Sequence, residues 1–400
     1  MIATWAGTLV EWEEELARLK ERVGSVLSRA ELRRSSGAFI DGLLSGAERK
    51  TGWLMAEEAG LDRPYRIQSL LGRSRWSADD LRDTVRGYVF ETLGCPDGVL
   101  VVDETGFVKK GDQSVGVARQ YSGTAGRIEN AQVGVFLAYA SRFGQALIDR
   151  RLYLPEAWAK DGARRAKTQV PEAVGFATKI EMAREMIASA LDAMSAAGYV
   201  PPRWVLADAL YGGDHRLRHL LEERRQPYVL AVRSNHHLRF FSPEGLMATD
   251  PATIAADLPL GAWATLAAGE GTKGLRLYDW ARLKLPWAAE DGFERWLLIR
   301  RHRREPDKLA FYLAFAPQQT IFAELAAAAG MRWTIEECFE RAKGELGLDH
   351  CEARSWHGWH RHMTLVMAAA AFLAKLAADL RRSAFGKANE RSPTNASALC

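Results

Sequence analysis

The sequence predicts an α/β protein in which a helical N-terminal region precedes an α/β domain with a β-rich insertion. In the first 95 residues, apolar residues recur at spacings of three and four, which is typical of amphipathic helices. From Gly98 onward, short apolar runs bounded by glycine indicate strands. Residues 226–320 combine alternating polarity with many aromatic side chains, which favours further strands.

The composition is that of an ordinary globular protein. Of the 400 residues, 48% are hydrophobic and 26% are charged, enough for two or three domains with a substantial core. No signal-peptide pattern opens the chain, and Lys375 interrupts the longest apolar stretch, residues 363–374, before it could span a bilayer. We therefore expect a cytoplasmic protein without a membrane partner. The cysteines form no CxxC pair, so reduced thiols are expected at Cys95, Cys338, Cys351 and Cys400.

The distribution of charge says more than its sum. A net charge of +4 and a pI near 8.8 do not by themselves establish a nucleic-acid partner. A single basic cluster is equally consistent with a solvated face. Five clusters together favour a polyanion, and they lie at residues 29–34, 63–75, 150–167 and 300–304 and around Arg381.

The N-terminal region predicts a candidate DNA-binding unit. Residues 51–61 and 64–71 are expected to form two short helices separated at Gly60, an arrangement compatible with a helix-turn-helix. The alternative is a plain helical hairpin with an exposed basic face. In the first case the DNA-binding side chains are Arg63, Arg66, Arg73 and Arg75.

The following elements predict an RNase H-like α/β core. Strands are expected at residues 99–103, 119–122 and 133–140, followed by a helix at 171–197, a strand at 204–208, a basic helix at 215–225 and a strand at 228–232. Within the β-rich part, residues 294–301 and 309–315 predict a hairpin. A helical pattern returns at Gly330 and, after a break near Ser355, runs to about Leu380.

These patterns divide the chain into five parts. The expected division is a helical, candidate DNA-binding domain at 1–95, the first part of the core at 96–225, the β-rich insertion at 226–320, the second part of the core with C-terminal helices at 321–384, and a flexible tail at 385–400.

Three carboxylates carry the main functional signal. Asp103 and Asp208 each close a strand-like apolar run, and ligands of open α/β sheets bind at the carboxyl ends of strands. Glu336 lies on a helix expected to begin near Gly330, where it shares one face with Arg332 and Lys343. Since a buried carboxylate is costly unless something binds it, the trio predicts a site for two divalent cations, roughly 3.5 to 4 Å apart.

Each feature also has a purely structural interpretation. Either aspartate alone could cap a helix after a strand. Arg332 and Lys343 could form surface ion pairs with Glu336 and Glu340 instead of holding phosphates. Three histidines near Cys351 have no standard zinc spacing, so helix-surface or DNA-backbone roles are favoured for His357, His360 and His362.

Taken together, the motifs resemble those of bacterial insertion-sequence DDE transposases. The signature helix of that family reads Tyr, two residues, Arg, three residues, Glu, six residues, Lys, and Arg332, Glu336 and Lys343 match it while Ala329 stands in place of the tyrosine. The segments 101–107 and 207–212 resemble the surroundings of the family's two aspartates. The resemblance extends from about Gly98 to the C-terminus.

This resemblance implies a DNA transposase that binds the terminal repeats of its element, cuts at the ends and joins them to target DNA by cut-and-paste. It implies that Asp103, Asp208 and Glu336 are catalytic and hold two Mg²⁺ ions, for which Mn²⁺ can substitute, and that a homodimer forms in the synaptic complex. It does not extend to the DNA contact and hairpin chemistry of the missing tyrosine. A nuclease that does not rejoin strands and a DNA-binding regulator without catalysis are the alternatives.

Overall fold

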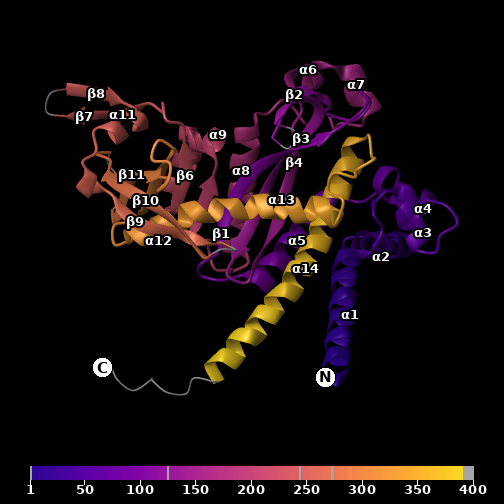
Figure 1. Ribbon diagram of the computed structural model, residues 1–400. Coiled ribbons are helices and arrows are strands. Elements are labelled where there is room, and N and C mark those ends of the chain that lie inside the picture. Colours follow the sequence, from indigo (N-terminus) through magenta and orange to yellow (C-terminus); the bar gives the residue numbers. More distant parts are fainter. Residues whose placement is uncertain are drawn as a thin grey trace.

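Five helices form the N-terminal region of the computed structural model, as the spacing of apolar residues predicted (Figure 1). The structure describes residues 2–390 except 124–125, 243–244, 272–273, 288 and 290. The two short helices predicted around Gly60 are present, and Gly60 has a φ of +64°, which glycine adopts without strain. The five helices are α1 Ile2–Ser25, α2 Ala30–Leu44, α3 Gly52–Glu58, α4 Tyr65–Gly72 and α5 Ala78–Leu93.

A mixed sheet of ten strands forms the centre of the molecule, with the order β2-β3-β1-β5-β6-β12-β11-β10-β9 and with β4 also paired to β3. β1 is antiparallel to β3 and parallel to β5, and β6 is parallel to β5. This is the mixed α/β arrangement that the element order predicted. The strands of this half are β1 Val99–Val108, β2 Ala118–Ser122, β3 Arg127–Ser141, β4 Gly144–Leu152, β5 Trp204–Ala207 and β6 Tyr228–Val232.

Two details of the predicted core are wrong. The strand β4 was not predicted, because polar residues such as Asp149 and Arg150 interrupt its apolar pattern. Both of these side chains are buried. The helix predicted at 171–197 is α8, which spans only Lys179–Ala196. It begins there because Thr178 and Glu181 form a capping box, in which each side chain accepts from the other residue's backbone N–H.

The strands predicted between residues 226 and 320 continue the same sheet. β12 pairs antiparallel with β6, and the predicted hairpin is formed by β11 and β12. A separate two-stranded sheet, β7 Leu238–Ser242 and β8 Gly245–Thr249, lies beside it, followed by α11 Pro251–Ala256. The remaining strands are β9 Ala264–Gly271, β10 Gly274–Lys284, β11 Phe293–Arg301 and β12 Leu309–Pro317.

Helices cover both faces of the core sheet. The pairing places Asp103, Phe136 and Arg150 in one row across β1, β3 and β4, and Phe136 contacts Phe339 of α13. The next row turns to the opposite face, because side chains alternate along a strand. There Glu104 contacts Lys179 and Arg151 contacts Glu185, both of α8. Figure 1 shows α13, Thr334–Gly344, running across the strands.

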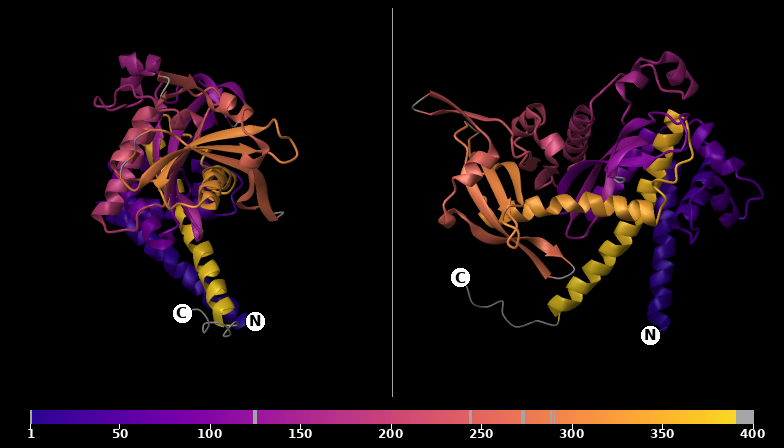
Figure 2. Two further views of the ribbon diagram at one scale, coloured as in Figure 1. Left: turned by 90° about the vertical axis from the view of Figure 1, so that its left-hand side faces the viewer. Right: turned by 45° about the horizontal axis from the view of Figure 1, so that its top comes forward.

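The long helix α14, Trp356–Glu390, packs against β4 and α5. Its segment Trp356–Ser383 is long and apolar enough to cross a membrane by length and composition, but its residues from Leu365 to Ala369 are fully buried inside the protein, as in a core helix. Figure 2 shows its C-terminal part extending away from the sheet on the same side as α1. The helix continues through residues 385–390 of the predicted tail, whereas 391–400 lie outside the described residues.

The remaining helices connect these elements. They are α6 Glu156–Lys160, α7 Gly162–Lys167, α9 Ala209–Gly212, α10 His215–Glu223 and α12 Phe322–Gly330. Cys95, Cys338 and Cys351 are buried free thiols, as expected, and Cys400 lies outside the described residues.

Candidate active site

Asp103 lies in the middle of β1, not at its end as predicted, because the strand continues to Val108. Its Oδ1 accepts a hydrogen bond from the backbone N–H of Glu104 at 2.8 Å. Burial, together with the nearby carboxylate of Asp208, raises the pKa of Asp103 to about 7. A pKa this far above the ordinary value means that the surroundings of Asp103 disfavour its charged form.

Asp208 directly follows β5, and the parallel pairing of Val102 with Ala207 brings it next to Asp103. It also caps α9, since its Oδ1 accepts from the N–H groups of Leu210 at 2.8 Å and Tyr211 at 3.4 Å. The capping role considered from the sequence is therefore real. Burial nevertheless raises the pKa of Asp208, and the charge of Glu104 adds to this effect.

Glu336 reaches the same place from the first turn of α13. The helix begins at Thr334, after a 3₁₀ turn at Met331–Trp333, and α12 ends at the predicted start, Gly330. Nη1 of Arg332 lies 3.1 Å from Oε1 of Glu336 and 3.7 Å from Oδ2 of Asp103. Burial raises the pKa of Glu336, with Arg332 acting in the opposite direction and Asp208 adding to the rise.

Lys343 binds to β1. Its Nζ donates to Oγ1 of Thr105 at 2.8 Å and to the carbonyl oxygen of Gly106 at 3.3 Å. Burial lowers the pKa of Lys343. This lysine therefore ties α13 to the strand that carries Asp103.

A fourth carboxylate beside the trio, that of Glu104, was missed by the sequence analysis. It accepts hydrogen bonds from the hydroxyl of Tyr211 and from Nζ of Lys179, the latter at 2.8 Å. The charge of Glu104 raises the pKa values of Asp103 and Asp208. Its position directly after Asp103 was visible in the sequence, but its partners come from residues 75 and 107 positions away.

The chemistry of these carboxylates fits divalent cations. Carboxylate oxygens are the preferred ligands of Mg²⁺, and a cation would offset both the burial of Asp103 and its repulsion by Asp208, which raise its pKa. In the described part of the chain, no three acidic, histidine or cysteine side chains already stand close enough to enclose a metal ion. Here the guanidinium of Arg332 occupies the space between Asp103 and Glu336.

Comparison with known proteins decides the family. A family model described as DDE superfamily endonuclease matches residues 22–254, and one described as transposase DDE domain matches residues 165–373. The chain belongs to the DDE transposases. The two matched ranges together contain Asp103, Asp208 and Glu336.

A curated relative supports this assignment to insertion-sequence DDE transposases. The chain is 29% identical over 199 residues to the probable transposase for insertion sequence element IS701 of Microchaete diplosiphon. The match covers 49% of this chain and 48% of that relative, so the chain spans about half the length of the curated relative it matches.

Ala329, which stands at the position of the family's signature tyrosine, is buried. Ala329 lies at the end of α12, which packs against β9, and only 4% of its surface is exposed. The neighbouring Gly330 is equally confined, because a Cβ there would collide with the carbonyl oxygen of Ala268. A tyrosine side chain at position 329 would therefore have to displace its neighbours.

The other predicted residues of the transposase lie apart from the carboxylates. Two of the three histidines are buried, contrary to the surface roles favoured above, because their ring nitrogens pair with carbonyl oxygens: His360 with Trp356 and His362 with Gly347. His357 is exposed. The four predicted DNA-binding arginines are also exposed, on and around α4, and their DNA contacts stay a prediction for Arg63, Arg66, Arg73 and Arg75.

Proposed function

We propose that this transposase binds the terminal repeats of its own element, cleaves the DNA at the ends and joins the freed 3′ hydroxyls to target DNA, in a cut-and-paste reaction. The observation that carries the proposal is the meeting of Asp103 and Asp208, from neighbouring parallel strands, with Glu336 from α13. Raised pKa values at all three positions support a functional site, because a purely structural site gains nothing from unneutralised charge.

Asp103, Asp208 and Glu336 would hold two Mg²⁺ ions, for which Mn²⁺ can substitute. When bound, divalent cations activate the attacking oxygen and stabilise the leaving oxygen of a phosphodiester. A water molecule would be the first nucleophile and the freed 3′ hydroxyl the second. The protein itself contributes position and charge, so no covalent enzyme intermediate is required.

Arg332 and Lys343 support this site in different ways. In the free protein Arg332 partly neutralises Asp103 and Glu336, and its guanidinium is suited to bind a phosphate once cations take over that task. Lys343 fixes the distance between α13 and β1 through Thr105 and Gly106. We expect a homodimer to hold two DNA ends together, acting on genomic DNA in the bacterial cytoplasm.

The deciding experiment is strand cleavage and joining on a labelled duplex that carries the element's own end, with Mg²⁺. Wild type and Asp208→Asn are compared with Asp214→Asn, a matched control in which another helix-capping aspartate is replaced. Asparagine caps helices as well as aspartate does, so both variants keep their caps. We expect cleavage and joining from wild type and Asp214→Asn and none from Asp208→Asn. Cleavage without joining would indicate a nuclease, and binding without cleavage would indicate a regulator.

A further inference from the structure

A large cleft lies between the N-terminal helices and the β4 edge of the core sheet. Its volume is about 1160 Å³, and its walls come from the segment after α4, from β4, from the loop before α8 and from the start of α14. The catalytic carboxylates do not line it. A second hollow of about 250 Å³ adjoins it, and the two share Gly72, Arg73 and Gln169.

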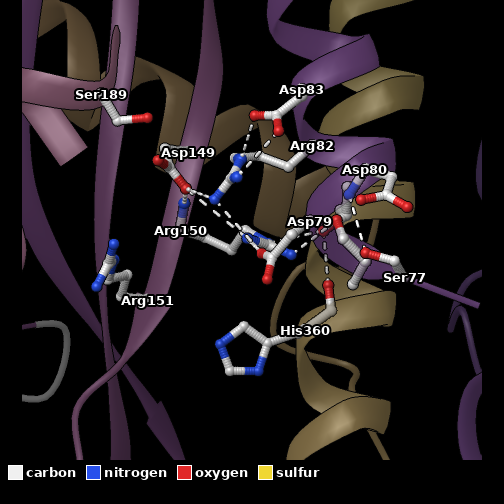
Figure 3. A network of polar contacts seen from close by, with 12 residues as sticks. Ser77, Asp79, Asp80, Arg82, Asp83, Asp149, Arg150, Arg151, Ser189 and His360 are labelled. Carbon is white, nitrogen blue, oxygen red and sulfur yellow. Dashed lines mark hydrogen bonds and ion pairs between the residues drawn. The ribbon is translucent and has the colours of Figure 1, made fainter. Parts of the chain in front are cut away.

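The inner wall of the cleft is a network of paired charges (Figure 3). Asp149 accepts from Arg86 at 2.9 Å and from Arg82 at 3.4 Å, while Arg150 donates to Asp79 at 2.8 Å. Asp149 and Arg150 are almost completely buried. These charges are already paired, so they shape the wall and leave ligand binding to other residues.

The rim of the cleft carries positive charge that the protein itself does not neutralise. Arg73 and Arg75 line the cleft, are exposed, and form no ion pair with any acidic side chain that the structure describes. In the adjoining hollow the same holds for Lys167 and Arg354. The acids that line the large cleft are already paired, Asp79 with Arg150 and Glu185 with Arg151.

Two further residues are fixed at the junction of this cleft with the core, one of them the cationic Arg361. Arg361 donates to the carbonyl oxygens of Leu71 at 2.9 Å and Trp76 at 2.8 Å, which holds the segment carrying Arg73 and Arg75 against α14. Gln169, which lines both hollows, has a φ of +57°, a backbone conformation that residues other than glycine rarely adopt. The rim is therefore held in place by tertiary contacts.

The cleft lies close enough to the carboxylates for one DNA duplex to reach both. Arg150 of its inner wall pairs across β3 with the position of Asp103, two strands away. At 4.7 to 4.9 Å per strand this is a lateral distance of about 10 Å. One turn of duplex DNA is about 34 Å long, so both sites fall within a fraction of a turn.

We propose that this cleft binds the sugar–phosphate backbone of the duplex DNA that flanks the cleaved end, with Arg73, Arg75, Lys167 and Arg354 as the phosphate contacts. Cations spread over two adjoining hollows match a polyanion better than a single small anion. The inference rests on the proposed function, because it places the same DNA that the carboxylates would cut. Of the four arginines predicted from the sequence, it selects Arg73 and Arg75.

The test is the salt dependence of binding to a fluorescein-labelled duplex of random sequence, without divalent metal. Arg73→Ala/Arg75→Ala is compared with Arg73→Lys/Arg75→Lys and with Arg29→Ala/Arg34→Ala, which removes the same charge from exposed positions outside the cleft. Each lost phosphate contact makes the slope of log K against log salt less steep by about 0.9. The double variant Arg73→Ala/Arg75→Ala should therefore bind on the order of 50-fold more weakly at 0.1 M salt. The lysine pair should keep the wild-type slope. Thermal unfolding confirms that each variant is folded.

Two results would refute DNA binding at this cleft. One is an unchanged salt slope for Arg73→Ala/Arg75→Ala. The other is an equal loss of affinity in Arg29→Ala/Arg34→Ala, which would indicate diffuse electrostatic attraction. A parallel loss in Lys167→Ala/Arg354→Ala supports it. The outcome is separable from the proposed function. Wild-type protein that cleaves while the cleft variants bind normally rejects the cleft alone, and wild-type protein that never cleaves while the cleft variants lose binding rejects the catalytic proposal alone.

Discussion

The guanidinium of Arg332 lies 3.1 Å from the carboxylate of Glu336, one helical turn further along the chain. The same Nη1 atom lies 3.7 Å from Asp103 on β1. Arg332 therefore joins the helix to the strand through the two acids proposed to hold metal. Its positive charge offsets the repulsion between these two half-buried carboxylates in the free protein.

Replacing Asp103 with asparagine should abolish cleavage and yet stabilise the metal-free protein. Folding raises the pKa of Asp103 to about 7, so the stability of the wild type falls as the pH rises from about 4 to about 7 and the group loses its proton. Asparagine does not titrate and keeps the hydrogen bond from Glu104. Above pH 7 we expect a gain on the order of 2 kcal/mol in urea unfolding. A variant that still cleaves would refute the catalytic role.

Arg332→Ala should weaken the complex with the element's end. Loss of one phosphate contact lowers the salt slope by about 0.9, measured by fluorescence anisotropy over a salt series. Arg341→Ala is the control, because it removes an exposed arginine from α13, the helix that directly follows the turn carrying Arg332. A slope equal to that of the wild type would restrict Arg332 to its ion pairs with Asp103 and Glu336.

Lys343→Met should destabilise the protein by about 1 to 2 kcal/mol, because it removes hydrogen bonds to Thr105 and Gly106 while keeping an apolar stem of similar length. Urea unfolding measures this loss. Binding to the end duplex is measured alongside it, and a lower salt slope would add a phosphate contact to the structural role. Unchanged stability would contradict the contacts described for Lys343.

Tyr211→Phe should slow cleavage while leaving DNA binding intact, since the hydroxyl of Tyr211 fixes Glu104 beside the two aspartates. A hydrogen bond to a charged group contributes about 1.5 to 3 kcal/mol. Since about 1.4 kcal/mol corresponds to a tenfold change in rate, we expect cleavage to slow by about tenfold or more. Tyr88→Phe is the control, because Tyr88 also donates to a glutamate, Glu15 at 2.7 Å, away from the site. Equal rates for both variants would show that Glu104 needs no such positioning.

His362 should make the protein sensitive to acid. Burial lowers the pKa of His362 from 6.5 to about 4, so the unfolded chain binds the proton more tightly than the folded one. Stability is therefore complete above pH 6.5 and is lost as the pH falls toward 4, by on the order of 3 kcal/mol. His362→Gln, whose amide can still donate to the carbonyl oxygen of Gly347, should reduce this loss in urea unfolding at a series of pH values. A wild-type pH profile in the variant would place the acid sensitivity elsewhere.

The sequence alone predicted the helical N-terminal region, the order of the core elements other than β4, and the three carboxylates as candidate site residues. The reason is physical: the period of apolar residues reports local backbone conformation, and costly charges at the ends of apolar runs are conspicuous. The β11–β12 hairpin was predictable for the same reason, since its turn and both strands are contiguous in the chain.

Only the tertiary structure decided which partners these side chains have. Residues far apart in sequence form the ion pair of Lys179 with Glu104 and the hydrogen bond of Lys343 to Thr105. The burial of Asp149 in β4 likewise depends on distant parts of the chain. No local pattern encodes such contacts, because side-chain direction and strand pairing depend on the whole fold. For the same reason the cleft beside Arg73 and Arg75 exists only once α14 holds their segment against the core.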